Sequence, residues 1–96
     1  MVIHIALFRW KAECSEADID AVMTDIRRLK QQIPEVIDLT AGVNFGPYNE
    51  GYTHAVVVTL KDRAALASYR DHPMHRPVAE AVDRMFEQSI GIDFEV

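Results

Sequence analysis

The sequence has few of the residues that would indicate disulfide bonds, nucleic-acid binding or insertion into a membrane. Cysteine occurs once, at Cys14, so no intramolecular disulfide is possible, as expected of a protein in the reducing cytoplasm. Lys and Arg number 10 against 15 Asp and Glu, and a formal net charge of −5 argues against nucleic-acid binding. No apolar run approaches the ~20 residues of a membrane-spanning helix, and the first residues lack a signal-peptide pattern. We therefore expect a cytoplasmic protein with no nucleic-acid or membrane partner.

What is present is the composition of a folded domain. Hydrophobic residues make up 49% and charged residues 26% of the 96 positions, which excludes intrinsic disorder. The chain is long enough for one hydrophobic core. It has no internal repeat, linker or low-complexity segment. We expect a single domain over residues 1–96.

Hydrophobic periodicity predicts alternating strands and helices. Strands are predicted over residues 2–10, 36–45, 52–60 and 90–96, and helices from Ser15 to Pro34, over 63–69 and over 77–86. Ser15 and Asp62 are the residue types that cap helix N-termini, and Pro34 ends the first helix because a residue before proline avoids the α region. The order β-α-β-β-α-β predicts an α+β, ferredoxin-like fold with a four-stranded antiparallel sheet.

Both faces of the first predicted strand are largely apolar, although a strand with one face in water would alternate apolar and polar residues. We expect the helices to cover one face of the sheet. The other face is then expected to carry Phe8, Trp10, Val56 and Val58, which is too much apolar surface to leave in water. A homodimer in which two sheets face one another would bury it. A monomer with an open sheet is the alternative.

Polar aromatic side chains fall at unexpected places in this pattern. His4 and His54 lie in mid-strand, on the face assigned above to the space between two sheets, while Tyr69, His72 and His75 crowd the break before the last helix. A histidine can exchange a proton near neutral pH, and a tyrosine hydroxyl in an apolar cavity can stabilise a developing negative charge on a carbonyl oxygen. Together these groups could remove a proton next to a carbonyl and stabilise the enolate.

Each of these residues also has a purely structural interpretation. A histidine on an apolar strand can be a core residue bonded to a backbone carbonyl, His72 can brace the turn before Pro73, and Tyr69 can be a packing residue. Three imidazoles, from His4, His54 and His75, could also hold zinc. No ligating carboxylate accompanies these histidines at a familiar spacing, and we predict neither a metal nor a cofactor.

Four segments, in order along the chain, resemble a known family. They are Val2–Trp10 (VIHIALFRW), Gly51–Val58 (GYTHAVVV), the run Tyr69–His75 with its H-P-x-H motif, and Asp93–Val96 (DFEV). Together they look like the stress-responsive A/B barrel (Dabb) domain, over essentially the whole chain.

The resemblance implies a dimeric α+β barrel. In the plant polyketide cyclases of this family, which need no cofactor, the residue matching His75 is the general base and the one matching Tyr69 polarises a carbonyl. Residues matching His4 and His54 line the same cavity. We expect further pocket-lining residues at Met23, Ile26, Val56, Asp71, His72 and Phe86, where a charged Asp71 departs from the aromatic tail pocket of the plant enzymes. Some relatives bind a cation through main-chain oxygens, here near Lys30, Ile33 and Val36.

The leading functional hypothesis is thus a cofactor-independent cyclase or lyase acting on a small apolar or aromatic carbonyl compound. Its catalytic residues would be His75, Tyr69, His4 and His54. One alternative is a non-enzymatic ligand-binding or stress-response dimer, whose function would not depend on His75. Another is a cofactor-free monooxygenase, which would consume oxygen with quinol-like substrates.

Overall fold

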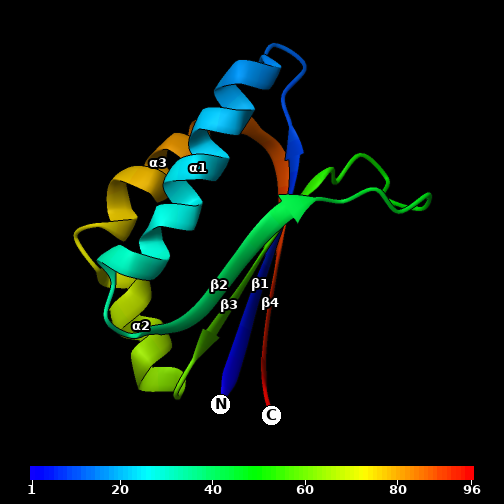
Figure 1. The fold of residues 1–96 in the computed structure, drawn as a ribbon. Helices are drawn as coiled ribbons and strands as arrows, with labels where there is room; N and C mark the ends of the chain where they lie inside the picture. The colour runs from blue at the N-terminus through cyan, green and yellow to red at the C-terminus, as the bar shows by residue number, and fades with distance from the viewer.

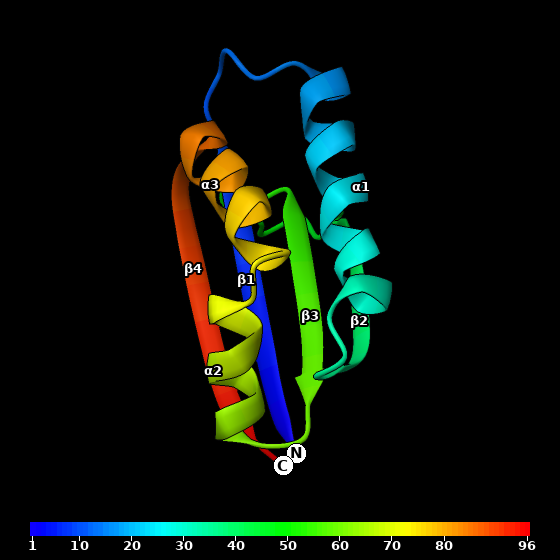
Figure 2. The ribbon, with the colours of Figure 1, turned by 90° about the vertical axis from the view of Figure 1, so that its left-hand side faces the viewer.

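The computed structural model describes residues 1–96 and shows a four-stranded antiparallel sheet with all helices on one face (Figures 1 and 2). The elements are β1 (Val2–Trp10), α1 (Glu16–Gln32), β2 (Val36–Val43), β3 (His54–Leu60), α2 (Arg63–Asp71), α3 (His75–Met85) and β4 (Phe86–Glu95). The strand order is β2-β3-β1-β4, so that β1 and β3 are central. This confirms the predicted ferredoxin-like α+β fold. None of the helices is long and apolar enough to cross a membrane.

The predicted helix caps are present. The Ser15 hydroxyl accepts a hydrogen bond from the Asp18 amide at 3.1 Å, and the Asp62 carboxylate accepts one from the Ala65 amide at 2.8 Å. Each bond satisfies one of the amides that a helix N-terminus leaves free. The first helix stops at Gln32, because Ile33 before Pro34 takes an extended conformation.

Predicted and observed boundaries agree within two residues in the middle of the chain and differ more at its C-terminal end. The last helix begins at His75 rather than near residue 77, and β4 follows it directly at Phe86. Phe86 adopts an extended backbone (φ −84°, ψ 143°) and pairs with Trp10 across a register shift in β1. Cross-strand pairing therefore overrides the helical periodicity that predicted a helix through Phe86.

The core shows that the predicted assignment of the two sheet faces was wrong. Phe8, Val56 and Val58 are buried in one cluster with the inward stripe of α1, and Trp10 packs against this cluster. All four residues therefore face the helices rather than a second sheet. The stripe consists of Val22, Met23, Ile26 and Leu29. Both faces of β1 are apolar, and alternation along a strand separates two faces without saying which of them a helix covers.

The face of the sheet that no helix covers is formed by the alternate residues of the same strands, whose side chains point away from the helices. Ile5 pairs with Val57 on β3 and with Ile92 on β4, and Leu7 pairs with Ile90. Ile90, Ile92 and Phe94 are 40–45% exposed. An apolar face without helices therefore exists, as the sequence predicted, although it is made of other residues.

Candidate active site

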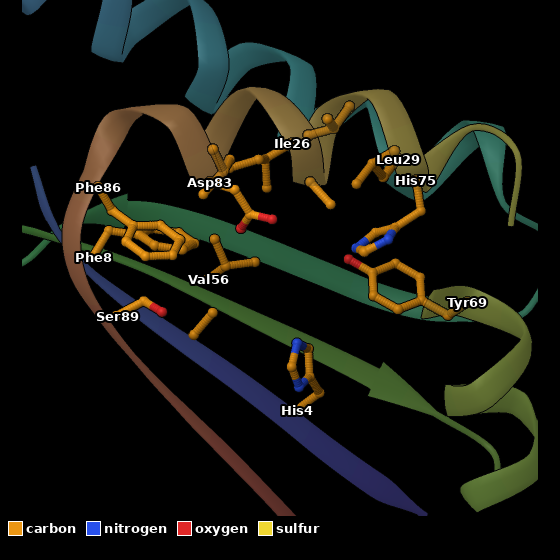
Figure 3. Close-up of a pocket in the computed structure, with 14 residues that line it drawn as sticks. His4, Phe8, Ile26, Leu29, Val56, Tyr69, His75, Asp83, Phe86 and Ser89 are labelled. Carbon is orange, nitrogen blue, oxygen red and sulfur yellow. The ribbon is translucent and has the colours of Figure 1, made fainter. Parts of the chain in front are cut away.

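A cavity of about 170 Å³ lies between the sheet and the helices (Figure 3). Ten of its 14 lining residues are hydrophobic, and they come from β1, β3, β4 and all three helices. An apolar cavity of ~150 Å³ can hold a benzene ring, so this one is large enough for a small aromatic compound. It lies within the single chain, because the row of residues that carries His4 faces the helices. The prediction that His4 and His54 point into a space between two sheets was therefore wrong.

Tyr69 and His75 meet at one end of the cavity. Tyr69 ends the buried stripe of α2, and His75 is the first residue of α3, so the short break between the helices brings them together. Their ring centroids are 4.5 Å apart with an interplanar angle of 54°. The His75 ring lies beside the Tyr69 hydroxyl (Figure 3).

A hydrogen bond fixes the orientation and tautomer of His75. Its Nδ1 lies 3.1 Å from the Arg70 carbonyl oxygen, which can only accept, so Nδ1 carries the hydrogen. Burial lowers the pKa of His75 below 6.5, and the nearby charges of His4 and Arg70 act in the same direction, while the hydrogen bond to Arg70 and the charge of Asp83 oppose it. Its Nε2 is therefore an unprotonated base at neutral pH.

Tyr69 is buried, with 3% of its surface exposed. Burial raises the pKa of its hydroxyl to about 12, since the charged phenolate is disfavoured away from water. The hydroxyl makes no hydrogen bond to another protein group. It thus stays protonated and is free to donate to a ligand in the cavity.

His4 lies on the floor of the cavity, and its ring stands up from β1 toward the helices (Figure 3). The His4 Nδ1 donates to the Asp93 carboxylate at 2.5 Å, and the other oxygen of Asp93 accepts from Arg70 at 2.5 Å. Partial burial on its own would raise the pKa of Asp93, but the hydrogen bonds from His4 and Arg70 outweigh it and lower the pKa. Asp93 therefore remains charged and holds the Nδ1 hydrogen of His4, so that Nε2 is the nitrogen left for a ligand.

His54 is not part of this cavity. Its Nδ1 accepts a hydrogen bond from the Trp10 indole at 2.9 Å, and the two rings meet edge to face with centroids 5.7 Å apart. Burial lowers the pKa of His54, which keeps this acceptor nitrogen unprotonated. His4, His54 and His75 therefore do not surround a common point, as the zinc alternative would require. The described residues contain no group of three or more His, Cys, Asp or Glu arranged to hold a metal ion.

The expected lining residues divide evenly. Ile26, Val56 and Phe86 line the cavity, whereas Met23, Asp71 and His72 do not. The Met23 side chain is buried in the core, Asp71 is exposed, and His72 accepts a hydrogen bond from the Met74 amide at 3.1 Å, so that it braces the turn.

Sequence reasoning missed three polar residues of the site. Asp93 was noticed only as part of the C-terminal motif, and its role depends on the pairing of β4 with β1, where it lies opposite His4. Asp83 follows His75 by two i+4 steps and therefore lies on the same helix face, a spacing that could have identified it. Ser89 lies opposite Phe8, on the helix-facing row.

Comparison with known proteins agrees with this architecture. The stress responsive A/B barrel domain (Dabb) model matches residues 2–96. Olivetolic acid cyclase from Cannabis sativa is 27% identical over 95 residues, covering 97% of this chain and 94% of that protein. A dimeric ferredoxin-like protein of unknown function from Thermobifida fusca superimposes with a TM-score of 0.89 at 29% identity, over 99% of this chain and 90% of the other. Hydroxynitrile lyase from Passiflora edulis shares the fold, with a TM-score of 0.92 at 24% identity over 99% and 92% of the two chains.

Proposed function

The chain belongs to the stress responsive A/B barrel domain family, and we propose that its cavity is the active site of a cofactor-independent cyclase or lyase. The substrate would be a small apolar or aromatic carbonyl compound. The observation that carries this proposal is the pairing of an unprotonated base, His75 Nε2, with an unengaged hydroxyl, Tyr69, in one apolar cavity. Enolate chemistry requires two groups: a base whose pKa lies near the operating pH, and a protonated hydrogen-bond donor.

The proposed step begins when His75 Nε2 removes a proton from the carbon next to the carbonyl. The electron pair of that C–H bond forms the carbon–carbon double bond of an enolate, and the carbonyl π pair moves to the oxygen. Tyr69 donates a hydrogen bond to this oxygen as its charge develops. In a cyclisation, the enolate carbon attacks a second carbonyl of the same molecule, and protonated His75 returns its proton to the new alkoxide. A lyase would use the same groups in the reverse direction.

His4 and Asp93 would position the substrate rather than remove its proton. The Asp93 carboxylate fixes one nitrogen of His4, and Arg70 fixes Asp93 in turn. The other nitrogen of His4 then faces the cavity in a defined orientation. His54 supports the cavity only indirectly in this proposal, through its contact with Trp10 near the end of β1.

Hydrogen–deuterium exchange at a carbon acid tests the proposal without knowledge of the natural substrate. Phenylacetone, a small ketone with acidic C–H groups beside its carbonyl, is incubated with the protein in D₂O and followed by proton NMR. We expect His75→Ala to slow the protein-catalysed exchange by at least ~10²-fold, the usual contribution of a general base. His72→Asn is the matched control, because His72 lies outside the cavity and Asn can still accept from the Met74 amide.

The outcomes distinguish the proposal from its main alternative. Exchange in His75→Ala as fast as in the unmodified protein would show that His75 is not the base. Binding of phenylacetone without any exchange above the buffer rate would favour a protein that holds its ligand without transforming it.

We also propose that the protein is a homodimer joined through the uncovered face of the sheet. The face carries Ile5, Leu7, Ile90, Ile92 and Phe94, an apolar surface of the kind that marks interfaces. The loop between β2 and β3 extends away from the body on this side (Figure 1), and its Phe45 and Tyr48 are 94% and 93% exposed. The Thermobifida fusca protein with the same fold is described as dimeric, which supports this assembly.

A further inference from the structure

The cavity has a second polar region, formed by residues outside the proposed proton-transfer machinery. The solvent-exposed Asp83 lines the cavity from α3, with its side chain pointing toward the sheet, and Ser89 lies below it on β4, next to Phe8 and Phe86 (Figure 3). Phe8 and Phe86 form an apolar wall there, with ring centroids 6.5 Å apart and an interplanar angle of 18°. Tyr69 and His75 occupy the opposite end.

The position of Asp83 follows from the geometry of α3. His75, Ala79 and Asp83 recur at i, i+4 and i+8 and line the same side of the cavity. Eight residues of α-helix span ~12 Å. A ligand with its carbonyl at Tyr69 would therefore lie along α3, with its far end toward Asp83 and Ser89.

The end of the cavity at Asp83 carries a negative charge that no cation balances. Asp83 forms no ion pair with a Lys or Arg, and no Lys or Arg side chain lines the cavity. The other nearby carboxylate, Asp93, is already engaged by His4 and Arg70. The charge of Asp83 reaches the other end of the cavity, since it favours the protonated form of His75. An anionic ligand would thus meet an opposing carboxylate and no compensating cation.

From this arrangement we infer that Asp83 and Ser89 select the substrate: they accept a hydroxyl or amino donor at the end away from the carbonyl, and Asp83 excludes carboxylates. The substrate class is an uncharged or cationic aromatic carbonyl compound with a hydrogen-bond donor. This inference rests on the proposed function, because it takes the cavity to be the substrate site. It adds a selection by charge, which the proton transfer itself does not require.

Binding of three matched probes tests the inference independently of turnover. The probes are acetophenone, 4-hydroxyacetophenone and 4-acetylbenzoate, which share one carbonyl-bearing ring and differ in the group at the far end. Their affinities are measured at pH 6.5 by protein-observed NMR titration. We expect 4-hydroxyacetophenone to bind most tightly, and 4-acetylbenzoate to bind about tenfold more weakly than acetophenone, as like charges a few ångströms apart in a partly solvated site imply.

Two substitutions, each of which removes one negative charge, distinguish the local effect of Asp83 from the general effect of net charge on binding. Asp83→Asn should increase the affinity for 4-acetylbenzoate about tenfold and change that for acetophenone less than about twofold. Glu80→Gln should change neither, because Glu80 is exposed on the same helix, as Asp83 is, but does not line the cavity.

Equal affinities for the three probes, absence of saturable binding of any probe at millimolar concentration, or the same effect from Glu80→Gln would overturn the inference. If the protein does not accelerate deuterium exchange of phenylacetone but the three probes bind in the predicted order, only the enolate chemistry is refuted.

Discussion

Replacing Tyr69 by Phe should make the ligand-free protein more stable and a poorer catalyst. The substitution removes only the hydroxyl and keeps the ring that packs in the core. Because the hydroxyl of this buried residue borders the cavity and has no protein partner, its removal leaves no other group unsatisfied. A stabilising effect is therefore expected from the same feature that makes the hydroxyl available to a substrate.

The magnitude follows from the environment of the hydroxyl. Burying a hydroxyl without a hydrogen bond costs ~1–3 kcal/mol. The hydroxyl borders a cavity that water can enter, which reduces the expected gain to ~0.5–1 kcal/mol, or ~2–8 °C in Tm for a domain of this size. Loss of one donor to a developing oxyanion costs ~10²–10³-fold in rate, so phenylacetone exchange should fall by about that factor.

Chemical denaturation at one fixed protomer concentration measures the first effect, since dimerisation would make stability depend on concentration. Tyr48→Phe is the control: Tyr48 is 93% exposed, and its hydroxyl loses only water, so a change within ~0.5 kcal/mol is expected. A Tyr69→Phe variant destabilised by more than that would mean that the hydroxyl has a structural partner. An unchanged exchange rate would mean that it does not contact the reacting oxygen.

Three other perturbations test the site and the assembly. Asp93→Asn removes the charge that holds His4, and we expect deuterium exchange to slow about tenfold, the equivalent of ~1.5 kcal/mol for a charge-assisted hydrogen bond; an unchanged rate would exclude a positioning role for Asp93. Because burial lowers the pKa of His75 below 6.5, exchange should be constant above pH 6.5 and decrease only at lower pH, and a rate that still rises above pH 7 would contradict the assignment. The same shift makes the unfolded state bind the proton more tightly, so the free energy of unfolding should decrease as pH falls below 6.5, less steeply in His75→Ala. Ile92→Asp should convert the dimer to monomers in sedimentation velocity, whereas Met74→Asp, at an equally exposed position (42% against 43%) on the helix side of the protein, should not; two dimeric variants would place the interface elsewhere.

Local patterns allowed much of the fold to be predicted. The stripe of Val22, Ile26 and Leu29 and the caps at Ser15 and Asp62 define helices through contacts within a few residues, so the sequence contains the relevant information. The same holds for the meeting of Tyr69 and His75, which are separated only by a short break in the helices. Their proximity was predicted, and their ring centroids are 4.5 Å apart.

What the sequence alone determined about this protein is therefore its elements, their order, and the presence of two apolar sheet faces. Only the tertiary structure decided which face the helices cover, because alternation in β1 distinguishes Phe8 from Leu7 but does not assign either row to the core. That choice places His4 in a cavity within the protomer. Strand pairing then brings Asp93 beside His4, although 89 positions separate them in the chain, and it leaves His54 with Trp10 instead. Such contacts depend on strand order and register, which no local pattern encodes.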